Sequence, residues 1–292
     1  MALINVDESR PSPLWAVVRL LATVGRPVRA EQARSLLSPP SLGPDDMFDL
    51  AIDTLSMLGM VTKTSDGRLG LEGATRSLDG QDFDTFAAVL RGRVLAPELN
   101  SDIGANDSQV GPRDLTQALA WFLSLDPATI ALNWVDAEQL MQGALREAAG
   151  PAIIGRARWA PFIDWSTALG LSAPALLDND QLTPDCTTAV RHIMRSTWKQ
   201  GQTVGAAEAL HLLRDELPVL PGGRYSAEVG IASPGDAAAG PALSFALLRG
   251  EDEKWLRLQR DADARQYLNI HEPGSRFPRP CSSLIILEGG DA

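Results

Sequence analysis

Apolar and polar residues follow two different periods in the N-terminal part of the chain. Over residues 14–24 the apolar side chains recur with the period of a helix, and similar runs follow at about 29–37 and 45–58. Two short alternating runs then flank Asp66-Gly67, a dipeptide that favours a tight hairpin turn. The pattern predicts three helices followed by a β-hairpin. Residues 1–12 are rich in polar residues and proline, and we expect an extended arm there that a partner would order.

This order of elements is typical of a winged helix, whose third helix enters the major groove of DNA. The third predicted helix, however, contains no Lys or Arg. It carries acidic residues instead, namely Asp45, Asp46, Asp49 and Asp53. Asp45 and Asp46 can cap the helix and favour its dipole, whereas Asp49 and Asp53 present a negative face. We therefore expect this segment to dock a protein, or to be structural, rather than to bind DNA.

A helical segment and then weaker versions of the winged-helix pattern follow. Residues 76–151 read as a helical segment, with helices at about 83–93, 115–125 and 135–149 and a loop at 95–113. A second winged-helix-like segment is expected over 152–223. Its elements are a helix over 156–171, a hairpin over 173–183 with Asp178 and Asn179 at its middle, and helices over 184–197 and 204–217.

The last segment, 224–292, opens after a Pro-Gly-Gly break and contains a helix at 242–249. Two alternating runs, 255–260 and 266–270, are expected to pair as a hairpin, with an edge strand at 282–287. A helix followed by such a hairpin would be a third winged helix. The predicted fold class is therefore mainly α with small β-hairpin wings, in tandem winged-helix-like domains with boundaries at 1–75, 76–151, 152–223 and 224–292.

Basic side chains gather in these later segments. The helix at 184–197 and the residues after it carry Arg191, Arg195 and Lys199 against a single acidic residue, Asp185. A second basic group surrounds the predicted C-terminal hairpin. The candidate DNA-contacting residues are Arg191, Arg195, Lys199, Arg257 and Arg260. An ordinary solvated, charged helix face is the alternative interpretation of the first group.

Composition limits the role that DNA can have. The chain has 292 residues and a formal net charge of −11, so its overall field repels a polyanion and a basic protein partner is at least as good a fit. No apolar run approaches the roughly 18 residues that a membrane span needs, and the N-terminus lacks a signal-peptide pattern. Cys186 and Cys281 are too few for a disulfide framework. We expect a cytoplasmic protein that contacts no membrane.

Motifs for catalysis are missing. There is no Gly-Lys dipeptide for a phosphate-binding loop, no His-Glu-x-x-His and no Gly-x-Ser-x-Gly, and the three histidines are scattered. We expect no catalytic residue, no metal site and no cofactor. Asp252-Glu253-Lys254 resembles the end of a nuclease motif, but the upstream Pro-Asp on a strand is missing, since Pro184-Asp185 begins a helix. A metal-dependent nuclease is thus a distant alternative.

Several stretches together resemble one known family. They are Pro-Leu-Trp-Ala-Val-Val-Arg-Leu-Leu at 13–21, Leu-Gly-Met-Val at 58–61, Phe-Ile-Asp-Trp at 162–165, Leu-Thr-Pro-Asp-Cys-Thr-Thr-Ala-Val-Arg at 182–191, Leu-Pro-Val-Leu-Pro-Gly-Gly-Arg-Tyr at 217–225 and Leu-Ser-Phe-Ala-Leu-Leu-Arg at 243–249. The chain resembles the DpdG proteins of the bacterial 7-deazapurine-in-DNA (Dpd) anti-phage clusters. The resemblance implies a non-catalytic component of a restriction system that works with helicase and nuclease partners. It carries over no catalytic residue.

From these observations we expect a winged-helix accessory subunit of a bacterial anti-phage DNA-restriction or DNA-processing complex. It would dock proteins through Asp45, Asp46, Asp49 and Asp53, and double-stranded DNA would be a further partner. The alternative from another class is a free-standing winged-helix DNA-binding transcriptional regulator.

Overall fold

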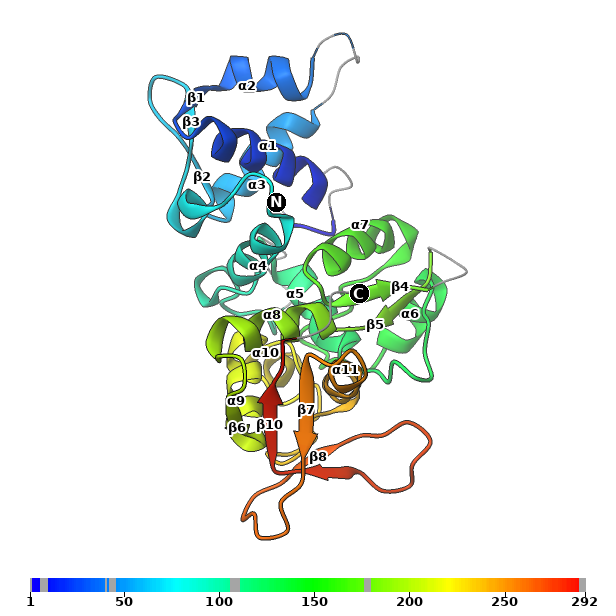
Figure 1. Cartoon of the computed structure of the whole chain (residues 1–292). Coiled ribbons are helices and arrows are strands. Elements are labelled where there is room, and N and C mark those ends of the chain that lie inside the picture. The colour runs from blue at the N-terminus through cyan, green and yellow to red at the C-terminus, as the bar shows by residue number, and fades with distance from the viewer. Residues whose placement is uncertain are drawn as a thin grey trace. The chain divides into compact units, whose positions relative to one another are not determined.

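The structure, a computed structural model, describes residues 2–5, 10–39, 41, 46–105, 111–175 and 180–288. In this part of the chain, helices predominate and the strands pair in small antiparallel sheets (Figure 1). The chain divides into two compact units. The first comprises Met1–Ser101, Ser108–Leu115 and Ala157–Leu169, and the second comprises Asp102–Asp107, Thr116–Arg156 and Gly170–Ala292.

The first unit begins with the elements that the hydrophobic pattern predicts. They are α1 (Pro11–Val24), β1 (Val28–Arg29), α2 (Ala30–Leu37), α3 (Met47–Met57), β2 (Val61–Lys63) and β3 (Arg68–Leu71). The three helices and the β2–β3 hairpin are confirmed, whereas β1 was not expected. This strand pairs with β3, so that the sheet has the order β1-β3-β2. Gly25 ends α1 in the left-handed conformation, with φ 67°, and turns the chain into β1.

The core of this unit lies between α1 and α3. The buried face of α1 packs on α3 and on the sheet, and α4 (Phe83–Val94) adds aromatic contacts. The Trp15 ring lies 5.7 Å from Phe83 and 4.9 Å from Phe86 between ring centroids. Short 3₁₀ helices follow the hairpin and α4, at Gly73–Ser77 and Pro97–Leu99. The apolar faces of α1, α3 and α4 are therefore buried within the unit, whereas α2 buries only Ala33.

The N-terminal arm is ordered by the chain itself, so the expectation that a partner would order it is wrong for residues 2–5. Leu3 and Ile4 are fully buried. Their backbone N–H groups donate to the Asp114 carboxylate, at 3.2 Å and 2.9 Å. Ala2 also forms a parallel bridge with Gly111. Because neither buried N–H can reach water, the hydrogen bonds to the Asp114 carboxylate offset the cost of burying these two groups.

The next helices along the chain follow the predicted pattern closely, and one of them is shorter than expected. α5 (Arg113–Phe122) and α7 (Gly155–Ala168) each have residues in both units, and α6 (Trp134–Met141) lies in the second. The helix expected over 135–149 stops at Met141 because Gly143 takes a left-handed conformation, with φ 77°. The expected hairpin is present as β4 (Ser172–Pro174) and β5 (Leu182–Pro184). Asp178 and Asn179 lie outside the described residues.

The second unit repeats the element order of the first. Its elements are α8 (Thr187–Thr197), β6 (Thr203–Gly205), α9 (Ala206–Glu216), α10 (Arg224–Glu228), α11 (Pro241–Asp252), β7 (Leu256–Gln259), β8 (Leu268–Ile270), β9 (Arg279–Cys281) and β10 (Ser283–Ile286). The series α8, β6, α9, α11, β7, β10 corresponds to α1, β1, α2, α3, β2, β3. The sheet order β6-β10-β7 corresponds to β1-β3-β2, and α8 packs on α11 as α1 packs on α3.

The expected hairpin between 255–260 and 266–270 is wrong. β7 pairs with β10, and β8 pairs with β9. Figure 1 shows β7 beside β10, with β8 in the long excursion of the chain between them. The reason is burial: Leu258 lies opposite Leu284 and Leu256 opposite Ile286, and all four side chains are buried on one face. The strand predicted at 282–287 is therefore the central strand of its sheet and not an edge.

Two glycines within helices, one exposed and one crowded by a side chain, allow a matched test of the packing in the second unit. A Cβ at Gly250 in α11 would lie 2.6 Å from the Trp255 ring, whereas a Cβ at Gly92 in α4 meets nothing within 4 Å. Alanine favours both helices by about 1 kcal/mol. We expect Gly92→Ala to raise the free energy of unfolding, and Gly250→Ala to lower it by about 1–2 kcal/mol because the buried indole must shift. Urea denaturation of both variants measures the difference, and equal stabilisation by both would contradict the described packing.

Candidate functional site

The basic residues of α8 differ in how accessible they are. Arg191 is half-buried, and its Nε is buried without a hydrogen-bond partner in the described part of the chain. Arg195, one turn further, is exposed and donates to the Glu288 carbonyl at 2.6 Å. Lys199 follows the helix and is exposed. Arg195 and Lys199 are thus better placed than Arg191 to meet a phosphate.

The sheet brings the end of α8 next to the end of β10. The backbone N–H of Gly201 donates to the Ile286 carbonyl at 2.8 Å, and the Ile286 N–H donates to the Gln202 carbonyl at 3.1 Å. Lys199 therefore lies near the end of β10 that Glu288 follows, where Arg195 is bound. The structure groups these two residues at one end of the sheet.

Arg257 and Arg260 occupy different places along β7. Arg257 is on the exposed face of the sheet, opposite Ile285 of β10, whereas its neighbours Leu256 and Leu258 are buried. Because β7 and β10 are antiparallel, Arg257 lies toward the end of the sheet that carries Arg195 and Lys199. Arg260 follows the other end of β7 and is exposed. Three of the five candidates, Arg191, Arg195 and Arg257, thus lie on α8 or β7, and Lys199 and Arg260 follow these elements, but the five do not form a single cluster.

The acidic face of α3 is only partly free. Asp46 is the N-cap residue, but its side chain makes no capping hydrogen bond, contrary to expectation. Asp49 forms an ion pair with Arg34 of α2, whose guanidinium lies 5.0 Å from the centroid of the Phe48 ring. Asp46 and Asp53 are exposed. Asp45 lies outside the described residues. The negative surface of α3 is therefore smaller than the sequence suggests.

The corresponding helix of the second unit, α11, has most of its charges paired. Arg249 donates to Asp185 and to Glu253, both at 2.7 Å, and these contacts raise the pKa of Arg249, with the Glu253 hydrogen bond contributing most. Glu251 receives two hydrogen bonds from Arg279, at 2.7 Å and 3.2 Å. Such pairs fix the position of α11 in the unit, and leave little charge on it to attract a ligand.

The nuclease-like triplet lies at the end of α11. Glu253 accepts from Arg249 and from the Trp255 indole N–H, at 3.2 Å, and Lys254 is in the left-handed conformation, with φ 60°. Among the described residues, no three His, Cys, Asp or Glu side chains are grouped as metal ligands would be. The triplet ends α11, and Glu253 holds Trp255 there.

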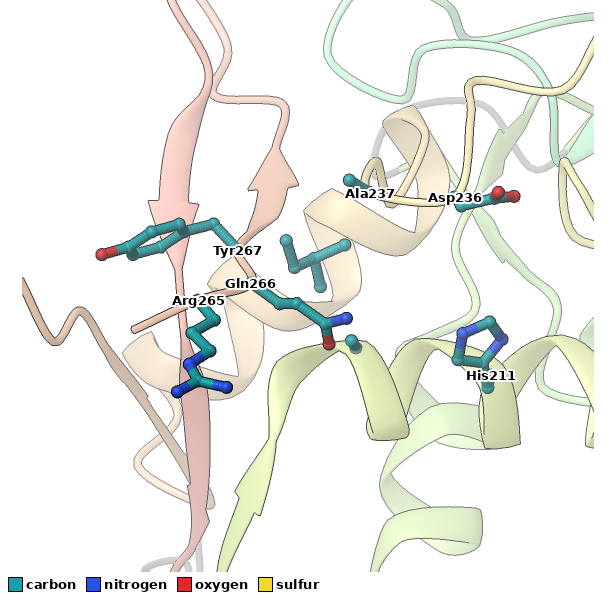
Figure 2. A pocket seen from close by; sticks show the side chains of 8 residues that line it. His211, Asp236, Ala237, Arg265, Gln266 and Tyr267 are labelled. Atoms are coloured by element: carbon teal, nitrogen blue, oxygen red, sulfur yellow. The ribbon is translucent and has the colours of Figure 1, made fainter. Parts of the chain in front are cut away.

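A cavity of about 340 Å³ lies in the second unit. Its lining comes from three separate segments, on α9, at 236–237 and at 265–268, which the sequence pattern had not connected. Figure 2 shows Gln266 extending toward the helix that carries His211, whereas the Tyr267 ring extends away from it and the Arg265 side chain extends downward in the view, apart from His211. The Tyr267 hydroxyl donates to the Asp261 carbonyl at 2.6 Å. The charged Arg265 thus does not converge with His211, and the cavity lacks a set of polar groups aimed at one point.

No helix among the described residues is both long enough and apolar enough to cross a membrane. No curated protein and no solved structure matches the chain. The model of one protein family does match, the family described as DpdG-like, and the match covers residues 1–264. This match confirms the resemblance that the motifs indicated, and the family fits an anti-phage setting. The chain belongs to the DpdG-like family, which associates it with the Dpd clusters.

Proposed function

We propose that this protein is a non-catalytic accessory subunit of a Dpd restriction or DNA-processing complex, built on two winged helices at 11–71 and 187–286. The observation that carries the proposal is the repeat of one element order and one strand order in the two units. A three-helix unit with a three-stranded sheet is a common scaffold for binding DNA and proteins. Membership of the DpdG-like family supports the setting.

The two repeats place their exposed charged residues on different elements, which suggests that they bind different partners. The first has Asp46 before α3 and Asp49 and Asp53 on it, with Asp49 paired to Arg34, and acidic surface favours a basic protein partner over DNA. The second presents Lys199, Arg257 and Arg260, none of which is ion-paired among the residues that the structure describes. We propose that the first repeat docks a helicase or nuclease component and that the second contacts double-stranded DNA.

One experiment with two arms tests this division. In the first arm, Asp46→Asn, Asp49→Asn and Asp53→Asn are combined in the full chain, which is co-expressed with the proteins encoded beside it. We expect the co-purifying partners to be lost and DNA binding to be kept. The matched control removes the same charge from other exposed positions, through Asp84→Asn, Glu147→Gln and Asp215→Asn. Equal loss in the control would show that net charge, and not α3, holds the partner.

In the second arm, Arg195→Ala, Lys199→Ala and Arg257→Ala are combined, and binding to a duplex is measured against salt concentration. Each lost phosphate contact should lower the salt slope by about 0.9. The control combines Arg26→Ala, Arg29→Ala and Lys63→Ala in the first repeat. Loss of DNA binding in the control alone would place the DNA contact on the first repeat and contradict the proposal.

Two other functions give different results in the same preparations. A free-standing transcriptional regulator would bind one DNA sequence with nanomolar affinity and a steep salt slope without any partner. A nuclease would cut DNA in the presence of a divalent metal and would lose this activity on Lys254→Ala. Either outcome would overturn the accessory-subunit proposal.

A further inference from the structure

We propose that the loop joining β8 to β9, residues 271–278, inserts Phe277 into the minor groove of duplex DNA as a wedge. We call this loop the finger. The inference rests on the DNA contact of the proposed function and adds the element and the mode of contact. The finger lies beyond residues 1–264 that the family model matches.

Both ends of the finger are fixed to α11. At its start, the His271 backbone N–H donates to the Ser244 side-chain oxygen at 2.8 Å. At its end, the Arg279 guanidinium forms a forked pair with Glu251, at 2.7 Å and 3.2 Å. A forked guanidinium–carboxylate pair restrains direction as well as distance. The finger is therefore mounted on the third helix of the repeat at both of its ends.

The finger also has internal order around the backbone of Phe277. The Ser275 N–H donates to the Glu272 carbonyl at 3.0 Å. The Ser275 hydroxyl then donates to the Phe277 carbonyl at 2.8 Å and accepts from the Phe277 N–H at 3.3 Å. Phe277 is 73% exposed, the most exposed of the large apolar side chains that the structure describes. A loop already held in one conformation loses less entropy when it binds.

The chemistry of the finger favours DNA as the occupant. The Arg276 guanidinium lies 5.8 Å from the centroid of the Phe277 ring, and Pro278 follows. Phe and Pro are among the side chains that wedge between base steps from the minor groove, and arginine is drawn into that groove by its negative potential. Residues 254–288 contain six Lys and Arg against four Asp and Glu, in a chain whose net charge is −11. This segment thus carries a small local excess of positive charge, which suits a polyanionic partner.

Fluorescence of 2-aminopurine in a duplex tests the wedge, because unstacking of this base raises its emission. With the full chain, we expect a rise on binding that Phe277→Ala abolishes, together with about a tenfold loss of affinity, the usual order of effect for one aromatic contact to a base. Phe277→Trp should keep the rise, and a ligand that fills the minor groove should compete. The control is Leu36→Ala, which removes another strongly exposed apolar side chain, 60% exposed, from the first unit.

The outcomes separate the finger from the proposed function. If Phe277→Ala unstacks the base and binds the duplex as the parent does, the proposal of a wedge is wrong. Loss of duplex binding in the variant of Arg195, Lys199 and Arg257 would in that case still support the proposed DNA contact. If Phe277→Ala loses a co-purifying protein and keeps DNA, the finger binds protein and the wedge is again wrong. A parent chain that binds no duplex overturns the wedge and the DNA contact, but leaves the docking arm to be judged by itself. Circular dichroism confirms that each variant is folded.

Discussion

Replacing Asp114 with alanine should lower the free energy of unfolding of the first unit by roughly 2–5 kcal/mol. The cause is the loss of the only carboxylate that accepts the buried N–H groups of Leu3 and Ile4 in the described structure. Each orphaned, buried donor costs about 1–3 kcal/mol. Leu3 and Ile4 are fully buried, so their release would also expose apolar surface. Urea denaturation and hydrogen exchange measure the effect, and protected amides at residues 3 and 4 in the variant would contradict it.

The Asp114 carboxyl group should also make the stability of the protein depend on pH. Burial raises the pKa of Asp114, although hydrogen bonds from the backbone of Ile4, Leu115 and Leu3 act to lower it. A carboxyl whose pKa is higher in the folded state favours folding at low pH, and this contribution is lost as the pH rises through the folded pKa. Asp114→Asn keeps one acceptor oxygen and does not titrate. As the pH rises above the ordinary carboxyl pKa of about 4, the parent should therefore lose stability relative to Asp114→Asn.

Replacing Arg214 with alanine should lower the free energy of unfolding of the second unit by about 2–4 kcal/mol. The Arg214 side chain is buried on α9 and donates to three carbonyl groups. They belong to Pro221, at 3.1 Å, and to Gly235 and Ala238, both at 3.0 Å. One guanidinium thus joins both ends of the connection between α9 and α11. Its pKa is lowered by burial, and the charge of Asp236 acts in the opposite direction.

The test of Arg214 includes a charge-matched variant. Arg214→Lys keeps the positive charge but cannot reach three acceptors in fixed directions, so it should recover only part of the stability. Arg260→Ala removes an exposed arginine of the same unit and should change little. Hydrogen exchange over residues 218–240 locates the effect. Unchanged exchange there in Arg214→Ala would show that the connection is held by other contacts.

Elements with a local signal could be predicted from the sequence. The periodicity of α1, its glycine cap and the Asp66-Gly67 turn all act within a few residues, and the β2–β3 hairpin forms where they indicate. The strands β1 and β6 have only two and three residues, too few to show a period. The pairing of β7 with β10 joins distant segments, and no local pattern distinguishes it from pairing with β8.

The candidate site shows the same limit. The outward position of Arg257 follows from the alternation of Leu256 and Leu258 around it, and the structure places it so. Arg195 contacts Glu288, and Arg34 contacts Asp49. In each pair, the tertiary fold brings together two residues from different elements. Charge counted along one helix could not reveal them. The Arg276–Phe277 pair was missed because a single aromatic residue in a polar loop carries no pattern.

The central place of β10 has a consequence for the order of folding events. In the first repeat, β2 and β3 are joined by a tight turn, so that two strands of the sheet can meet early. In the second repeat, β10 is the only described strand with which β6 and β7 pair, and each is separated from it by a long stretch of chain. Loop closure must therefore precede any strand contact. Until residues 283–286 arrive, both partner strands expose unpaired edges, which makes this half of the molecule the slower to fold and the more exposed to aggregation.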